Sequence, residues 1–181
     1  QFIEKCMMSI LEQNYDNYKT VVINDCSTDN TYEILLKLHN KYNFDLIRNE
    51  VRLRSPLENW IKGIELCSKD KEDIIVTVDG DDYLANNNVL TYLNNIYQDE
   101  NIWMTYGQFE PLSKSYSHYC KPIPDTRTYR RSGQWLTSAL RTVKRKLFDK
   151  IDRNDLKTED GQYYKVSGDS AYMYPIIEMA G

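Results

Sequence analysis

Long apolar runs and basic character are both missing from this chain of 181 residues. No apolar stretch approaches the roughly 20 residues that a membrane-spanning helix needs, and no signal peptide is visible. The formal net charge is −4, whereas nucleic-acid-binding domains usually carry a strongly basic surface. We therefore expect no transmembrane segment and no nucleic-acid partner.

Glycine and cysteine are scarce as well, with 7 and 4 residues. The chain contains neither G-x-x-x-x-G-K-[S/T] nor G-x-G-x-x-G, so a glycine-rich phosphate-binding loop of either type is not expected. The cysteines include no C-x-x-C pair, which argues against a zinc site and favours reduced thiols. Together these features predict a cytoplasmic protein, and peripheral attachment to a membrane stays open.

What the chain does contain is a regular alternation of helical and strand patterns up to residue 106. Apolar residues recur at helical spacing in four segments, and short apolar or β-branched runs lie between them. The predicted helices are 2–11, 30–42, 57–66 and 87–97, and the predicted strands are 20–23, 44–47, 74–78 and 102–106. Asn30 and Glu33 resemble a capping box at the start of the second helix. This alternation is typical of an α/β domain with a mostly parallel sheet flanked by helices.

The pattern is weaker in the second part of the chain. Residues 107–131 predict a long loop with a short strand or two. A basic, amphipathic helix is expected over 134–151, with its Arg and Lys residues on a solvated face. A polar loop over 152–167 and a final helix over 169–180, interrupted or kinked at Pro175, complete the chain. The length suits a single domain covering residues 1–181.

The most informative stretch is Asp79-Gly80-Asp81-Asp82, which directly follows the predicted strand 74–78. Side chains at i and i+2 of an extended backbone point the same way, so Asp79 and Asp81 could face one site. A divalent cation would offset the repulsion between these carboxylates, and Mg²⁺ typically takes one or two carboxylates plus substrate phosphates. The alternative is an acidic cap for the following helix.

A second polar loop, residues 24–31, follows the predicted strand 20–23. In an open α/β sheet, ligands bind beyond the C-terminal ends of the strands, where both acidic loops fall. A carboxylate there can accept hydrogen bonds from a base or a ribose, and a metal can bridge an acidic loop to a polyphosphate. Asp29, near the end of the loop, suits helix capping better than substrate binding.

Three segments together carry a family resemblance. Residues 21–31 read Val-Val-Ile-Asn-Asp-Cys-Ser-Thr-Asp-Asn-Thr, residues 78–84 hold the acidic stretch, and residues 9–15 read Ser-Ile-Leu-Glu-Gln-Asn-Tyr. They resemble, respectively, the V-V-D-D-G-S-T-D-x-T segment, the aspartate-rich metal motif and the S-I-L-x-Q-x-Y helix ending of family-2 glycosyltransferases with the GT-A fold. The similarity covers about residues 2–106. It implies a nucleotide-sugar-binding half over 1–106 and an acceptor-binding half over 107–181.

The resemblance implies a UDP-sugar, Mn²⁺ or Mg²⁺, and inverting transfer to a hydroxyl of a glycan, a protein or a lipid-linked acceptor. By position, Asp25 would bind the nucleobase, Asp81 would ligate the metal, and Asp79 would approach the ribose or the metal. Asp82 would orient the sugar of the donor, and Arg54 would help to hold the nucleotide. Asp25 could instead shape its loop as an Asx turn, and Arg54 could be a solvated surface residue.

Inverting transfer also needs a base that removes the acceptor proton. The family places this base at the start of a helix after the metal motif, and Asp169 matches that place. Asp160, in the polar loop before it, is the rival. In the basic segment between them and the metal motif, Arg141 or Lys144 could face the diphosphate instead of solvent.

The chain also departs from the family pattern. The opening strand of the family is missing, so the chain could be a fragment, and Cys26 replaces the usual glycine, which changes the φ that the loop allows. No Gln-x-x-Arg-Trp pattern is present, which argues against a processive polymerase. Two alternatives stay open: a metal-dependent nucleotidyltransferase, and a non-catalytic module that binds sugar nucleotides or carbohydrate. The sugar, the acceptor and the oligomeric state are not predicted.

Overall fold

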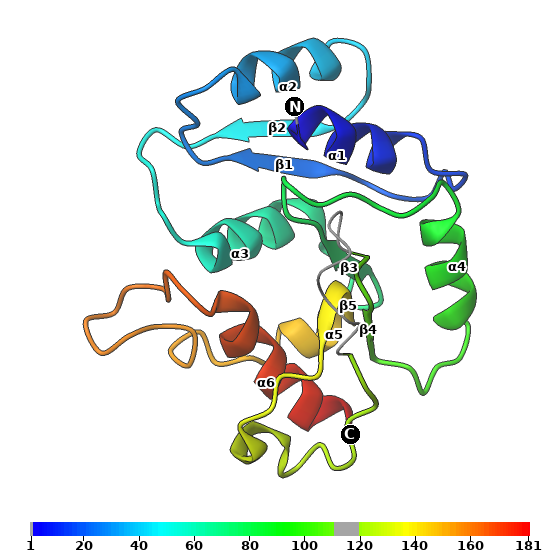
Figure 1. Ribbon diagram of the computed structural model, residues 1–181, viewed down its shortest axis with the longest axis vertical. Helices are drawn as coiled ribbons and strands as arrows, with labels where there is room; N and C mark the ends of the chain where they lie inside the picture. Colours follow the sequence, from blue (N-terminus) through cyan, green and yellow to red (C-terminus); the bar gives the residue numbers. More distant parts are fainter. Residues whose placement is uncertain (1, 111–119) are drawn as a thin grey trace. The chain divides into compact units, whose positions relative to one another are not determined.

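The computed structural model describes residues 2–110 and 120–181 (Figure 1). The chain divides into two compact units. The first consists of Gln1–Cys67 with Val78–Glu100, and the second of Ser68–Thr77 with Asn101–Gly181. Part of the loop predicted over 107–131, residues 111–119, lies outside the described residues.

Among the described residues, the first unit contains a two-stranded parallel sheet and four helices. They are α1 (Phe2–Leu11), β1 (Val21–Asn24), α2 (Thr31–His39), β2 (Asp45–Arg48), α3 (Pro56–Cys67) and α4 (Val89–Ile96). The order and type of all six elements are those predicted from the sequence. Their ends differ from the predicted ones by a few residues, as helix and strand ends commonly do.

The two faces of this sheet are covered by different helices, because neighbouring residues of a strand point to opposite sides. Val22 packs against the apolar cluster that contains Met7 of α1 and Leu35 of α2. Ile23 lies on the other side against α3, where a Cβ on Gly63 would be 3.7 Å from Ile23 Cγ1. The sheet is therefore sandwiched between α1 and α2 on one face and α3 on the other (Figure 1).

The start of α2 differs from the prediction in one detail. Asn30 makes no capping hydrogen bond with its side chain, so the predicted capping box with Glu33 is wrong. Asp29 acts in its place, because its Oδ1 accepts a hydrogen bond from Thr31 N at 3.0 Å. The predicted capping role of Asp29 is thus confirmed, and the cap is an Asx-type contact two residues along the chain.

Among the described residues, the second unit combines a three-stranded antiparallel sheet with three helical segments. They are β3 (Ile74–Thr77), β4 (Met104–Gly107), η1 (Tyr129–Ser132), β5 (Ser138–Lys144), α5 (Arg145–Phe148) and α6 (Gly168–Ala180). The strand order is β3-β5-β4, so β5 lies between the two strands that the sequence predicts and runs antiparallel to both. The structure is α/β as expected, but the parallel alternation does not extend to β3 and β4.

The helix predicted over 134–151 is wrong. Strand β5 and the one-turn helix α5 occupy this segment, because pairing with two neighbouring strands outweighs the helical spacing of its basic residues. Lys144 and Arg145 are only 5% and 7% exposed. The predicted solvated face is therefore wrong as well.

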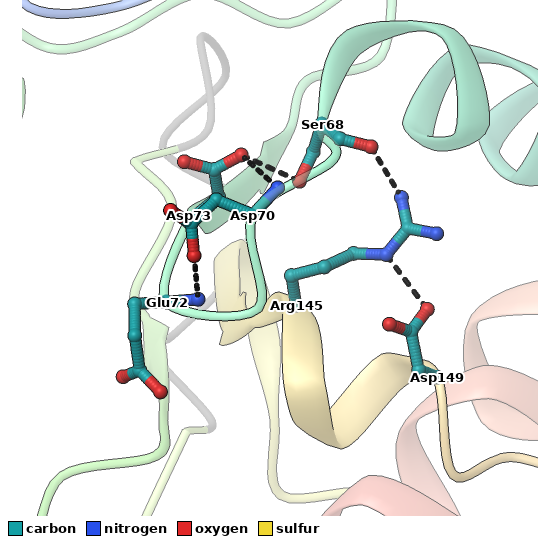
Figure 2. Close-up of polar contacts among 6 residues, drawn as sticks. All are labelled: Ser68, Asp70, Glu72, Asp73, Arg145 and Asp149. Carbon is teal, nitrogen blue, oxygen red and sulfur yellow. Dashed lines mark hydrogen bonds and ion pairs between the residues drawn. The ribbon is translucent and has the colours of Figure 1, made fainter.

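Arg145 fixes the loop that leads into β3, as Figure 2 shows. Its Nη1 donates a hydrogen bond to Ser68 O at 2.8 Å, and its Nε donates to Asp149 Oδ1 at 2.7 Å. Within the loop, Asp73 Oδ2 accepts hydrogen bonds from Ser68 Oγ at 2.8 Å and from Asp70 N at 3.3 Å. A guanidinium this deeply buried needs such partners, and they join the start of β3 to the end of β5.

The final helix is confirmed and runs from Gly168 through Pro175 to Ala180 without interruption. Its buried face meets α5, where the rings of Tyr172 and Phe148 lie with centroids 5.9 Å apart. This contact holds the first turns of α6 against α5 within the second unit. Among the described residues, no helix combines the length and the apolar character that crossing a membrane requires.

Candidate functional site

Asp25, directly after β1, is the centre of a hydrogen-bond network in the first unit. Its Oδ1 accepts hydrogen bonds from Leu53 N and Asn49 Nδ2, both at 2.8 Å, and its Oδ2 accepts one from Arg54 N at 3.0 Å. Burial favours a raised pKa for Asp25, but these donors and Asn59 outweigh it and hold the pKa below its ordinary value. The ionised carboxylate therefore holds the segment after β2 against the end of β1.

Asn49 belongs to this network, although the sequence analysis did not select it. It is 5% exposed, and its Nδ2 also donates to Asn59 Oδ1 at 2.9 Å. Its Oδ1 accepts a hydrogen bond from Lys62 Nζ at 2.7 Å. Asn59 and Lys62 are three residues apart on α3 and share one side of that helix. The only signal in the sequence was the place of Asn49 just beyond a predicted strand.

Cys26, in the loop after β1, has a left-handed backbone conformation of the kind that glycine favours. Its φ is 53°, in the left-handed region, which costs a residue with a side chain about 1–2 kcal/mol. The Cys26 Sγ donates a hydrogen bond to Asn49 O at 2.8 Å. The thiol therefore adds a contact between the loop after β1 and the segment after β2.

The acidic stretch forms a turn and not the extended backbone that was expected. Strand β3 ends at Thr77, and Asp82 N donates a hydrogen bond to Asp79 O at 3.0 Å, which closes a β-turn. The argument that i and i+2 spacing aims Asp79 and Asp81 alike is therefore wrong. Asp79 is half-buried, whereas Asp81 and Asp82 are exposed.

The carboxylates of this turn gather near the thiol of Cys6 on α1. Cys6 Sγ donates a weak hydrogen bond to Asp79 O at 3.5 Å. Burial, and then the charges of Asp82, Asp79 and Asp81, raise the pKa of Cys6 to about 12. Three of the four residues of the turn carry carboxylates, so the turn is a strongly acidic segment next to α1.

This donor set suits a hard divalent cation, for which carboxylate oxygens are the preferred ligands. In residues 2–110 and 120–181, no three His, Cys, Asp or Glu side chains are arranged to hold a metal ion by themselves. A Mg²⁺ or Mn²⁺ ion at the turn would therefore take further ligands from phosphate and water, as Mg²⁺ commonly does. The metal-ligand roles of Asp81 and Asp79 stay predictions, and only the carboxylate chemistry of the turn supports them.

Asp169, the predicted base, lies in the first turn of α6 in the second unit. Its Oδ2 is 3.2 Å from Arg141 Nη1 on β5, and its Oδ1 accepts a hydrogen bond from Ser170 N at 2.9 Å. The Asp169 side chain is 35% exposed, whereas that of Arg141 is 13% exposed. The carboxylate is thus oriented by the sheet and still accessible to a substrate.

Asp160, the rival base, lies in an exposed turn of the same unit. Its Oδ1 accepts hydrogen bonds from Thr158 Oγ1 at 2.5 Å and from Gln162 N at 3.3 Å. The Thr158 hydroxyl and then the Gln162 amide hold the pKa of Asp160 below its ordinary value. A carboxylate with a lowered pKa is a weaker base. The choice of Asp169 over Asp160 stays a prediction.

Comparison with known proteins decides the family. The sequence profile described as "Glycosyl transferase family 2" matches residues 1–154. The chain belongs to this family. A search of curated proteins found no match.

Solved structures of S. aureus TarS share the fold. TarS 1–349 in complex with UDP gives a TM-score of 0.65 at 18% identity, and its complex with UDP-GlcNAc gives 0.63 at 17%. Each match covers 96% of this chain but only 52% and 50% of TarS 1–349. A longer TarS structure gives a TM-score of 0.60 at 21% identity, and the match covers 31% of that structure. The likeness confirms the predicted GT-A fold, and this chain spans about half the length of TarS 1–349.

Within this family-2 domain, the predicted site residues fall into both units. Asp25, Arg54 and the acidic turn lie in the first, and Asp169 lies in the second. The hydrogen bonds of Asp25 reach across to the segment after β2, whereas an Asx turn would bond its own loop. Arg54 is exposed with φ 59°. The ligand-binding and catalytic roles of these residues stay predictions.

The second unit of the family-2 domain also contains a hollow of about 270 Å³ beside α6. Its lining includes Arg130, Asp155, Tyr164, Ser170 and Tyr174. The guanidinium of Arg130 lies over the Tyr174 ring at 5.6 Å from its centroid. Aromatic walls with a few polar groups are usual in small-molecule sites, and Ser170 follows Asp169 directly in the chain.

Proposed function

We propose that this domain transfers a sugar from a UDP-sugar to an acceptor hydroxyl with inversion, with the help of Mn²⁺ or Mg²⁺. The observation that carries the proposal is the acidic turn, with the carboxylates of Asp79, Asp81 and Asp82 gathered in one compact unit with the Asp25 loop. In a family-2 domain, this pair of acidic loops fits a nucleoside diphosphate. The family match favours sugar transfer over nucleotidyl transfer.

The first unit supplies the groups that would hold UDP. Asp25 accepts hydrogen bonds from the Asn49 side chain and from the backbone amides of Leu53 and Arg54. The loop that these bonds hold is the proposed place of the nucleobase. Asp81 and Asp79 would hold the cation, Asp82 would orient the sugar, and Arg54 would contact the nucleotide. The cation would supply positive charge that stabilises the leaving diphosphate.

The second unit supplies the proposed base. Asp169 would take the proton of the acceptor hydroxyl as that oxygen attacks the sugar carbon from the side opposite the UDP leaving group. Arg141 holds the carboxylate in one orientation while leaving it partly exposed. The hollow beside α6 is the proposed place of the acceptor, which could be a glycan, a protein or a lipid-linked molecule.

UDP-GlcNAc is the first donor to test, because TarS 1–349 was crystallised with UDP and with UDP-GlcNAc. Thermal shift of the purified protein with a panel of UDP-sugars, each with Mn²⁺ or with EDTA, would show binding, since a ligand of the folded state raises Tm by mass action. We expect at least one UDP-sugar to raise Tm in Mn²⁺ and much less in EDTA. Release of UDP from that donor would then show turnover. A binding-only module would show the Tm shift without any release.

A further inference from the structure

One side of α1 runs along the segment that carries the acidic turn, and the proposed function gives this side no role. Ile3 lies against the turn, where a Cβ on Gly80 would be 3.4 Å from Ile3 Cδ1. One helical turn later, Cys6 Sγ donates its hydrogen bond to Asp79 O. These two contacts seat the turn itself on the first half of α1.

Ser9 and Gln13 continue the contact beyond the turn. Ser9 Oγ accepts a hydrogen bond from Leu84 N at 3.0 Å. Gln13 Nε2 donates to Asn86 O at 2.7 Å, and Gln13 Oε1 accepts from Leu90 N at 2.9 Å. Gln13 is only 8% exposed, so loss of these partners would leave buried polar groups unsatisfied.

The order of these contacts follows the order of the chain. Positions 3, 6 and 9 lie on one side of α1, and Gln13 follows just beyond its end. Their partners advance from the turn to the start of α4. The segment between the turn and α4 has no regular secondary structure, so its backbone groups need partners elsewhere. Ser9 of α1 and Gln13 provide two of them, at Leu84 N and Asn86 O.

We propose that Ser9 and Gln13 are positioning residues for the acidic turn. By holding the backbone that follows Asp82, they fix the carboxylates of Asp79 and Asp81 where a cation and a diphosphate can meet them. The proposal rests on the proposed function, and neither side chain has to touch the nucleotide. Ordering the turn before the ligand arrives lowers the entropy lost on binding. A less ordered turn therefore weakens the binding of ligands that need the metal, and it leaves the binding of other ligands unchanged.

Two substitutions at Ser9 distinguish the effect of its hydroxyl from other effects of changing the side chain. Ser9→Ala removes the acceptor for Leu84 N and the donor to Cys6 O, whereas Ser9→Thr keeps a hydroxyl and serves as the rescue variant. Tyr18→Phe is the matched control, because Tyr18 OH donates to Ile10 O at 3.0 Å. It removes one hydrogen bond from the same helix but none from the segment after the turn.

Gln13→Glu is a second test that preserves the side-chain volume. It keeps an acceptor for Leu90 N and lacks the N–H donors for Asn86 O and Ser9 O. Agreement between Gln13→Glu and Ser9→Ala would show that the effect comes from the shared segment and not from one site. Tm measurements on both variants identify any that fail to fold.

Calorimetric titration with two ligands distinguishes positioning from general stability. Uridine lacks the diphosphate, whereas UDP with Mn²⁺ needs the acidic turn. We expect Ser9→Ala and Gln13→Glu to weaken UDP binding in Mn²⁺ by about tenfold, with uridine affinity unchanged. Ser9→Thr and Tyr18→Phe should bind both ligands as the unmodified protein does. Unchanged UDP binding in Ser9→Ala and Gln13→Glu, or an equal loss for uridine, would overturn the proposal.

Hydrogen exchange of the unliganded protein keeps this test separate from the proposed function. Ser9→Ala should speed exchange in residues 79–90 and leave β1 unchanged, and Tyr18→Phe should leave residues 79–90 unchanged. Exchange in residues 79–90 that stays the same in Ser9→Ala contradicts positioning, whatever the protein binds. If the unmodified protein binds neither UDP nor Mn²⁺, the proposed function fails while the exchange result still decides the positioning role.

Discussion

Arg141 on β5 holds Asp169 at the start of α6, with Nη1 and Oδ2 3.2 Å apart. The guanidinium is nearly buried, and the carboxylate keeps about a third of its surface exposed. One partner is therefore fixed by the sheet and the other faces outward. This is the arrangement that an oriented but accessible base requires.

Asp169→Asn tests the proposed base directly. The asparagine amide cannot remove the proton from the hydroxyl of the acceptor substrate. We therefore expect kcat to fall by about 100-fold or more, with UDP affinity unchanged. Asp160→Asn is the matched control and should stay close to the unmodified protein. Steady-state kinetics with the best donor checks both. A large loss in Asp160→Asn with little change in Asp169→Asn would move the base to Asp160.

Arg141→Gln tests whether the ion pair orients the base or the arginine contacts the diphosphate. If Arg141 acts through Asp169, kcat falls about tenfold or more while the Kd for UDP is unchanged. Titration with UDP next to single-turnover kinetics separates the two effects. A higher Kd for UDP would instead place Arg141 against the phosphates.

Asp25→Asn should destabilise the fold at neutral pH and much less in acid. The pKa of Asp25 is lowered in the folded protein, so its ionised form stabilises the protein above the unfolded pKa of about 3.9. That contribution is lost as pH falls through the lower folded pKa. Replacing the carboxylate should lower the free energy of unfolding by about 2 kcal/mol at pH 7.

Urea unfolding of both proteins over a pH series measures this difference. The difference in the free energy of unfolding between the unmodified protein and Asp25→Asn should become smaller below about pH 4. A gap that stays constant across the series would show that the charge of Asp25 is not what holds the segment after β2.

Cys26→Gly should be more stable than Cys26→Ala. Both variants lose the thiol contact with Asn49 O, but only glycine adopts the left-handed conformation without strain. We expect a difference in the free energy of unfolding of about 1 kcal/mol. Thermal or urea unfolding of the pair checks it, and an alanine variant at least as stable as the glycine variant would contradict the strain argument.

Local patterns were sufficient to predict the first unit and the last helix. The apolar spacing in 2–11 and 57–66 predicted two helices, and α1 and α3 are found there. Cys6, Met7, Leu57, Ile61 and Ile64 are buried as that spacing predicts, whereas Phe2 and Leu66 are exposed. The short β-branched runs that became β1 and β3 are equally local signals. The acidic turn was found because three carboxylates directly follow an apolar run, and Asp25 was found through the family resemblance of residues 21–31.

Long-range partners could not be predicted in the same way. The segment of β5 carries Arg141, Lys144 and Arg145 at helical spacing, and only its place between β3 and β4 makes it a strand. Asn49 is likewise unremarkable in the sequence, because Asp25 and Lys62 become its neighbours only in the fold. The bend at Asp79–Asp82 depends on a hydrogen bond that an extended reading misses.

The central claim is that the acidic turn holds a metal-dependent UDP site. Titration of UDP into the unmodified protein and into Asp81→Ala, each in Mn²⁺ and in EDTA, tests it most directly. We predict clear UDP binding by the unmodified protein in Mn²⁺, with a loss of about tenfold or more both in EDTA and in Asp81→Ala. UDP affinity that depends neither on Mn²⁺ nor on Asp81, or no UDP binding at all, would contradict the account.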